Sequence, residues 1–250
     1  MRRNPANKMI TPAMFACAIM LAGCAGAPSV DMPSASPTGR NIDAELAAEN
    51  VFDAGEALFE FWTLVPVRGT GHWTLVSRDG SGTGVAVRGE ARDSASGVMI
   101  EAFVDTAACP VLEWEWMVES VQATADLTRK ETDDVAAAIM VLFGDPGTPM
   151  APKPVPTLRY VWTGAGHPVG AIIANPYLPD IVKNIVVRNG SALVNDWQTE
   201  RRDLHADYID AFGAPPEDEV WAVGLFIDND QTGEPAAARF SRADVYCKKR

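Results

Sequence analysis

The chain has 250 residues, of which 47% are hydrophobic and 22% charged, and 33 Asp and Glu against 21 Lys and Arg give it a formal charge of −12. This length and composition predict a folded protein with one sizeable core. A surface this acidic excludes a nucleic-acid-binding protein, because phosphates require a basic patch. It also excludes direct docking on anionic lipid headgroups.

The N-terminus has the features of a bacterial lipoprotein signal. Three basic residues precede an apolar run from Met9 to Leu21, which is too short to span a bilayer. The run ends in Leu21-Ala22-Gly23-Cys24, which resembles a lipobox, the motif in which the Cys is lipidated and the signal is cleaved before it. We therefore expect residues 1–23 to be a signal peptide and acylated Cys24 to attach the protein to a lipid bilayer.

Cleavage would leave the protein more acidic and place it in the cell envelope. It removes three of the 21 basic groups, so that 18 face 33 acidic groups and the formal charge becomes −15. By resemblance to such lipoproteins, Ala25 after the Cys favours the outer membrane, with the protein facing the periplasm. Residues 24–41, rich in Pro, Ser, Ala and Gly, are expected to be a flexible tether, and residues 42–250 a single domain.

After Trp62 the sequence predicts short strands separated by turns, whereas residues 42–61 fit either a short helix or a first strand. The expected strands are His72–Ser77, Thr83–Glu90, Gly97–Asp105, Val111–Glu119, Val135–Phe143, Thr157–Thr163, Asn184–Arg188, Trp197–Leu204, Val220–Asp228 and Ala237–Tyr246. One short helix is expected at His205–Phe212, where Gly213 would end it. Many short strands without alternating helices predict an all-β fold, an antiparallel β-sandwich or jelly roll.

The strand Val111–Glu119 has two chemically different faces. Leu112, Trp114, Trp116 and Val118 alternate with Glu113, Glu115, Met117 and Glu119. Because successive side chains of a strand point to opposite sides of the sheet, we expect the first set in the core. The carboxylates then form either a solvated surface or one wall of a polar cleft.

Carboxylates are the remaining candidates for catalysis, because the sequence lacks the serine-hydrolase elbow, the zinc-protease helix, the Walker loop and the dinucleotide-binding motif. A glycoside hydrolase needs two carboxyl groups across a cleft, and Glu115 with Asp134 is the candidate pair. The alternative is that Glu115 is solvated and that Asp134 belongs to a turn before a strand.

A binding site is the other hypothesis for the same region. Tyr160 and Trp162 lie on one face of their strand and could stack on sugar rings, while Glu113, Glu115, Asp134 and Arg202 could bind hydroxyl groups. The alternative for the two aromatic residues is the core, where such residues are more common.

The segment Asp228-Asn229-Asp230-Gln231-Thr232-Gly233 is the candidate for a cation site. Alternating oxygen-bearing side chains suit Ca²⁺, with Asp228 and Asp230 as ligands. The alternative is an Asx-rich turn whose side chains bond their own backbone. No cofactor is expected apart from such a structural calcium ion.

Two cysteines remain after Cys17 leaves with the signal and Cys24 is lipidated. Cys109 and Cys247 could form a disulfide in an oxidising periplasm, or stay separate buried thiols.

Several separated motifs carry a resemblance to a known family. From about Trp62 to Tyr246 the chain resembles bacterial domain-of-unknown-function family 3047. The residues concerned are Ser94-Ala95-Ser96-Gly97, Pro110, Leu112-Glu113-Trp114-Glu115-Trp116, Asp133-Asp134, Leu158-Arg159-Tyr160-Val161-Trp162, Trp197–Arg202, Asp207-Tyr208, Phe212-Gly213 and Asp228–Gly233. The family implies no activity. The strand pattern is also similar, in general terms, to galactose-binding-like sandwiches, which supports the architecture only.

The sequence thus predicts an envelope-anchored lipoprotein that binds a glycan or another small polar ligand. One alternative is a polysaccharide hydrolase or lyase that uses its carboxylates. Another is a structural or assembly lipoprotein of the envelope.

Overall fold

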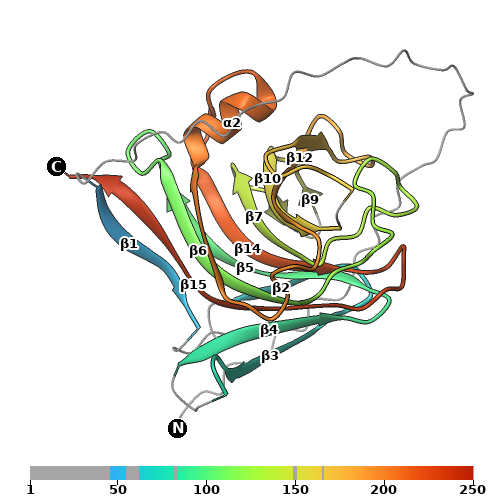
Figure 1. Cartoon of the computed structure of the whole chain (residues 1–250). Helices are drawn as coiled ribbons and strands as arrows, with labels where there is room; N and C mark the ends of the chain where they lie inside the picture. The colour runs from blue at the N-terminus through green and yellow to red at the C-terminus, as the bar shows by residue number, and fades with distance from the viewer. Residues whose placement is uncertain (1–45, 55–61, 81–83, 149–150, 165, 250) are drawn as a thin grey trace, which may run out of the picture.

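The computed structural model describes residues 46–54, 62–80, 84–148, 151–164 and 166–249. Within these residues the protein is a sandwich of two β-sheets with one helix (Figure 1). The described part contains no helix that is long and apolar enough to cross a membrane. Cys24 and the expected tether lie outside the described residues.

The first sheet, sheet A, has the strand order β13-β6-β15-β4-β3, and β1 also pairs with β15. All of these pairs are antiparallel. The strands are β1 (Leu46–Asp53), β3 (His72–Ser77), β4 (Val85–Ala91), β6 (Val111–Ser120), β13 (Gln198–Asp203) and β15 (Ala236–Lys248). The long strand β15 contacts β1, β4 and β6, and therefore organises the sheet.

The second sheet, sheet B, has the order β11-β12-β10-β7-β14-β5-β2. Its pairs are antiparallel except that β10 and β12 run parallel. The strands are β2 (Thr63–Arg68), β5 (Ala95–Val104), β7 (Ala137–Phe143), β10 (Thr157–Thr163), β11 (Ile172–Ala174), β12 (Val182–Asn189) and β14 (Val220–Asp228). A separate small hairpin consists of β8 (Gly147–Thr148) and β9 (Ala151–Pro152).

The all-β sandwich expected from the sequence is confirmed, and each of the ten expected strands lies within two residues of its predicted ends. The strands β2, β8, β9 and β11 were not predicted, whereas β1 lies within residues 42–61, for which the sequence left a short helix or a first strand open. In β2 five of six residues are exposed, because β2 is an edge strand. A strand exposed on both faces lacks the alternation that marks a half-buried one.

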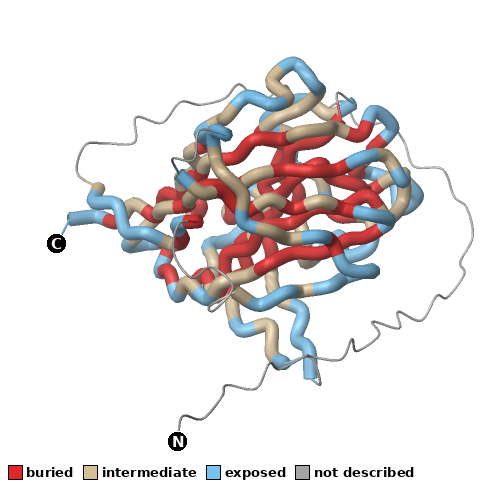
Figure 2. The backbone as a smooth tube through the Cα atoms, turned by 90° about the horizontal axis from the view of Figure 1, so that it is seen from below, coloured by how far each residue is buried: buried red, intermediate tan, exposed pale blue. Residues whose placement is uncertain are grey.

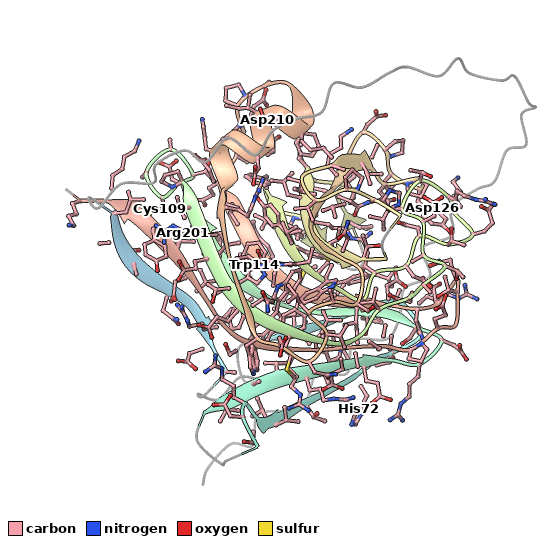
Figure 3. The ribbon with its side chains drawn as sticks, in the orientation of Figure 1. His72, Cys109, Trp114, Asp126, Arg201 and Asp210 are labelled. Atoms are coloured by element: carbon pink, nitrogen blue, oxygen red, sulfur yellow. A yellow bond between two sulfur atoms is a disulfide. The ribbon has the colours of Figure 1, made fainter. Side chains whose placement is uncertain are left out.

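The core lies between the two sheets, and Figure 2 shows the buried residues in red along the middle of the strands. Trp114, labelled in Figure 3, and Trp116 of β6 are 0% exposed. Trp114 packs against Tyr160 of β10 with ring centroids 5.2 Å apart, and Trp116 packs against Trp162 at 5.8 Å. Such aromatic pairs contribute about 0.5–1.5 kcal/mol each beyond burial itself. The predicted apolar face of β6 is thus confirmed as core.

A second apolar cluster lies on the other side of sheet B. Val161 points away from Tyr160 and Trp162 because side chains alternate along β10, and it packs with Leu127 and Val135. Both of these residues come from the connection between β6 and β7. This connection therefore covers part of the outer side of sheet B.

The helix α2 (Leu204–Phe212) ends as predicted and begins one residue before the predicted His205. The Asp203 carboxylate accepts a hydrogen bond from the Ala206 backbone N–H at 2.9 Å, which caps the first turn. Gly213 adopts φ 82°, and its N–H donates to the Ile209 carbonyl. A glycine suits this left-handed position because it has no Cβ.

Cys109 and Cys247, for which the sequence left pairing open, are joined by a disulfide with an S–S distance of 2.07 Å. Cys109 precedes β6 and Cys247 lies at the end of β15. These strands are paired, with Tyr246 opposite Val111. The pairing of β6 with β15 therefore brings the two cysteines together.

Candidate functional site

The carboxylates of β6 lie on the outer side of sheet A, opposite the core. Glu113 and Glu115 alternate with Trp114 and Trp116, so their side chains point away from the sandwich. They remain partly exposed, at 13% and 18% of the side-chain surface. The neighbouring strands β13 and β15 bring arginines beside them.

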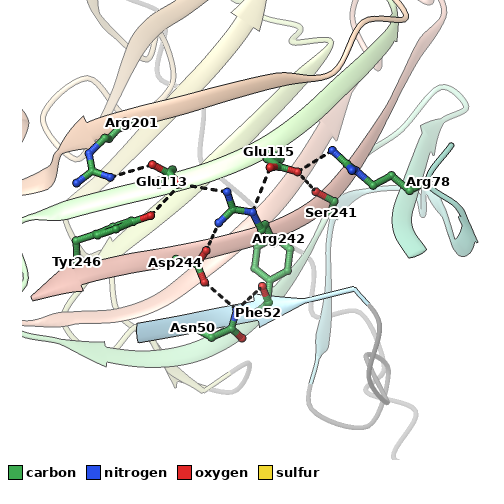
Figure 4. Close-up of polar contacts among 10 residues, drawn as sticks. All are labelled: Asn50, Phe52, Arg78, Glu113, Glu115, Arg201, Ser241, Arg242, Asp244 and Tyr246. Atoms are coloured by element: carbon green, nitrogen blue, oxygen red, sulfur yellow. Dashed lines mark hydrogen bonds and ion pairs between the residues drawn. The ribbon is translucent and has the colours of Figure 1, made fainter. Parts of the chain in front are cut away.

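Each of the two glutamates is held by three hydrogen bonds (Figure 4). Glu115 accepts from Arg78 at 2.9 Å, from the Ser241 hydroxyl at 2.9 Å and from Arg242 at 3.2 Å. Glu113 accepts from Arg201 at 2.9 Å, from Arg242 at 3.1 Å and from the Tyr246 hydroxyl at 3.0 Å. We call this arrangement the charged row; its members are Arg201, Glu113, Arg242, Glu115 and Arg78.

An aromatic ring lies at each end of the charged row. The Arg201 guanidinium stacks over Tyr246 at 4.0 Å from the ring centroid, and Arg78 stacks over Trp197 at 4.7 Å. Planar guanidiniums stack well on such rings. The arginines are therefore held on two sides, by a carboxylate and by a ring, although about a third of each side chain is exposed.

The electrostatics of this face favour ionised carboxylates. Burial alone would raise the pKa of Glu113, but the hydrogen bonds from Arg201, Tyr246 and Arg242 outweigh it and hold the pKa below its usual range. Glu119 on the same face shows the same balance, with Arg88 and Arg239 as donors. These groups are acceptors, and they are unsuited to donating a proton near neutral pH.

Asp134 does not belong to the charged row. It lies before β7, is 0% exposed, and accepts hydrogen bonds from the backbone N–H groups of Gln231 and Thr232. Glu115 bonds a different set of residues, on the outer side of sheet A. The structure thus does not bring the candidate catalytic pair Glu115 and Asp134 together, because β6 and the start of β7 belong to different sheets.

Asp134 instead meets the acidic turn after β14. One carboxylate oxygen each from Asp134, Asp228 and Asp230 lie within 4.8 Å of one another. Burial raises the pKa of Asp228 well above its usual value, and the nearby Asp230 adds to this. The predicted ligands Asp228 and Asp230 are therefore adjacent, with Asp134 as a third carboxylate from another segment.

Two further buried polar residues, which sequence reasoning assigned no role, lie beside this cluster. Asp133 is 3% exposed, and burial raises its pKa to about 6 although Arg159 opposes the shift. The Arg159 guanidinium is 3.9 Å from the Asp133 carboxylate and stacks over Phe226. In the sequence, Asp133 could have been recognised by its position next to Asp134. Arg159 could have been recognised as a charged residue inside the apolar strand β10.

The hypothesis that Tyr160 and Trp162 contact a ligand is wrong. They are 0% and 1% exposed, because this face of β10 meets the two tryptophans of β6. The Tyr160 hydroxyl donates to Asp207 at 2.9 Å, and Arg202 makes two hydrogen bonds to the same carboxylate. Arg202 therefore fixes α2 to the sandwich through Asp207.

Two surface hollows lie away from the charged row. One of about 350 Å³, near the start of α2, is acidic and includes Asp105, His205 and Glu217. The other, of about 260 Å³, is largely apolar and includes Trp62 and Trp73 at the edge between β2 and β3. Neither lining includes an arginine. The charged row thus offers the better combination of fixed donors and acceptors.

Several solved structures are similar to this chain, each at low identity and with a TM-score below 0.5. A family 11 carbohydrate-binding module from Clostridium thermocellum has 9% identity and a TM-score of 0.44, over 81% of this chain and 96% of that one. The xyloglucanase domain of NopAA from Sinorhizobium fredii has 12% identity and a TM-score of 0.41, over 82% and 99%. A xylan-binding domain of Xyn10C from Paenibacillus barcinonensis has 10% identity and a TM-score of 0.39, over 79% and 92%. The carbohydrates that these names mention are ligands or substrates of the similar proteins named here.

Among curated proteins no match to the sequence is found. The family described as "Protein of unknown function (DUF3047)" matches residues 60–243, which include all of sheet B, sheet A apart from β1 and the end of β15, the charged row and the acidic turn. The family suspected from the separated sequence motifs is therefore confirmed, and the chain belongs to DUF3047.

Proposed function

We propose that this protein is a binding module for a neutral glycan, held at the bacterial envelope by acylated Cys24. The ligand lies on the outer side of sheet A, along the charged row. The carrying observation is the unbroken sequence of hydrogen bonds from Arg201 through Glu113, Arg242 and Glu115 to Arg78.

The charged row suits hydroxyl groups because its donors and acceptors alternate. A sugar hydroxyl donates one hydrogen bond and accepts others, so vicinal hydroxyls can bridge a guanidinium and the adjacent carboxylate. The side chains are already held in place by their mutual bonds and by stacking on Tyr246 and Trp197. Binding then costs little additional side-chain entropy.

The charge of this surface favours a neutral ligand. Three arginines of the charged row are balanced by Glu113, Glu115 and Asp244, which pairs with Arg242. The whole chain has a charge of −12. An anionic polysaccharide would meet repulsion from the rest of the surface without a net positive patch to offset it.

Binding fits this surface better than glycoside hydrolysis. A glycosidase needs a carboxylic acid that stays protonated near neutral pH, whereas the pKa of Glu113 lies below its usual range. The two glutamates also lie side by side on one strand rather than across a cleft.

The test is a glycan array followed by calorimetry with the oligosaccharide that binds best. The informative variant is Glu113→Gln, which removes the charge and keeps the shape. The matched control is Glu119→Gln, on the same strand and face but bonded to Arg88 and Arg239 instead.

On the array we expect the protein to bind neutral oligosaccharides and not to bind acidic oligosaccharides. Loss of a charged hydrogen bond, worth about 1.5–3 kcal/mol, should weaken binding about 10- to 150-fold in Glu113→Gln, and the control should bind like the wild type. The absence of retained glycans, or equal affinity of Glu113→Gln and the wild type, would overturn the proposal. Glycan turnover would instead support a hydrolase or lyase, and a co-purifying envelope protein would support an assembly role.

A further inference from the structure

The acidic cluster after β14 is built from segments that are far apart in the sequence. Asp134 comes from the connection between β6 and β7, whereas Asp228 ends β14 and Asp230 lies in the following turn. Their carboxylate oxygens lie within 4.8 Å of one another. Asp134 also holds the turn through hydrogen bonds from Gln231 and Thr232, so the three groups have a fixed relative position.

We propose that Asp134, Asp228 and Asp230 together bind one calcium ion. An ion at this point joins the connection between β6 and β7 to the turn between β14 and β15. It therefore stabilises the end of the sandwich at which this connection covers sheet B. The site is separate from the charged row.

A buried oxygen without a partner supports the site independently of the three ligands. The Asp133 side chain is 4% exposed, and it is close enough to Asp134 and Asp230 for their charges to act on its carboxyl group. One of its oxygens accepts a hydrogen bond from Asn175 at 2.6 Å, but the other, Oδ1, is buried without a hydrogen-bond partner. A buried acceptor left unsatisfied is costly, and a cation in the neighbouring cluster would provide the missing attraction.

The charge of the cluster matches one divalent cation. Four carboxylates gather here, from Asp133, Asp134, Asp228 and Asp230. Two guanidiniums lie against them: Arg68 pairs with Asp230 at 2.9 Å, and Arg159 lies near Asp133. Two negative charges remain in excess. Arg68 is 67% exposed, so water screens its contribution.

The chemistry and spacing of the ligands favour calcium over other common metals. All three ligands are carboxylates, which suit hard cations, whereas zinc sites use His and Cys. Calcium bonds oxygen at about 2.3–2.6 Å, so ligand atoms on opposite sides can be about 5 Å apart. Magnesium requires about 2.0–2.1 Å and a strict octahedron, keeps several waters and is usually bound through one or two carboxylates, so a group of three carboxylates favours calcium.

The experiment compares the full chain with calcium or with EDTA, by thermal unfolding and by calorimetric titration of the EDTA-treated, dialysed protein. Asp230→Asn replaces a carboxylate by a neutral amide at the least buried position of the three. Asp93→Asn is the matched control because Asp93 is exposed and has a φ of 47°, which Asn tolerates.

We expect the titration to show one calcium per chain. Calcium at about 100 times its Kd should raise the wild-type Tm by about 5 °C or more, and magnesium by less. Asp230→Asn should show a much smaller rise, because a neutral amide oxygen is a weaker calcium ligand than a carboxylate. In EDTA its Tm should stay close to that of the wild type, because the loss of the ion pair with the largely exposed Arg68 is offset by the loss of one repelling charge. Asp93→Asn should respond like the wild type.

The proposal is overturned if the wild type has the same Tm in calcium and in EDTA and the calorimetric titration detects no calcium binding. It is equally overturned if Asp230→Asn responds like the wild type. If Asp230→Asn does not fold, the wild-type titration decides alone. Glycan binding is measured separately on the charged row, so a failure of one proposal leaves the other standing.

Discussion

Removal of the disulfide between Cys109 and Cys247 should lower stability strongly without changing the fold. The two cysteines are separated by 138 positions in the sequence. A cross-link over a loop of this length lowers the entropy of the unfolded chain by about 17 cal/mol/K, which corresponds to about 5 kcal/mol at 25 °C. This is a large fraction of the stability of an ordinary domain, about 5–15 kcal/mol.

The folded state should survive reduction because other contacts hold the same two segments. The Lys248 backbone N–H donates to the Ala108 carbonyl at 2.9 Å, and its side chain donates to the Ala107 carbonyl at 2.8 Å. Tyr246 remains opposite Val111 in the pairing of β15 with β6. The effect should therefore arise mainly in the unfolded chain.

Urea unfolding with and without reductant measures the effect. With an m-value of about 2–3 kcal/mol/M, the loss of about 5 kcal/mol moves the midpoint down by about 2 M. The variant with both Cys109→Ala and Cys247→Ala should unfold like the reduced wild type and should not respond to reductant. A midpoint that moves by less than about 0.5 M on reduction would refute the reasoning on loop entropy.

Three further predictions concern the charged face, the core and the anchor. A carboxyl group whose pKa is lower in the folded than in the unfolded state stabilises the fold at pH values above 4.5, the ordinary pKa of Glu. This stabilisation is lost as the pH falls below 4.5. Arginine hydrogen bonds lower the pKa of Glu113 and Glu119. Hydrogen bonds from Arg92 and Arg88 lower the pKa of Glu90 to about 2. The Tm should therefore fall from pH 4.5 towards pH 2. Glu119→Gln should reduce the slope, and equal slopes would contradict this explanation. Trp162→Ala should cost about 3–5 kcal/mol in chemical unfolding, since Trp162 is 1% exposed; a stable variant that had lost only ligand affinity would contradict its place in the core. Cys24→Ser should abolish labelling by radioactive palmitate and release the protein from the membrane fraction, whereas a still-labelled variant would argue against the predicted lipobox.

Local patterns were sufficient for most of the fold. The alternation along β6 predicted that Trp114 and Trp116 are buried, and Gly213 marked the end of α2. These signals depend only on the period of a strand and on the conformational freedom of glycine. The pattern failed for Tyr160 and Trp162, where the same alternation fits an exposed face as well as a buried one. Only the packing of β10 against β6 decided between them.

The sequence by itself determined an acidic chain with an apolar face and a carboxylate face on β6, and an acidic turn after β14. The tertiary structure decided what those carboxylates meet. Arg78, Arg201 and Arg242 reach Glu113 and Glu115 from separate parts of the chain, and Asp134 joins Asp228 and Asp230 across 94 positions or more. The period of side chains is a local property of the backbone, whereas such partners depend on strand order and register, which form only when the whole sandwich assembles.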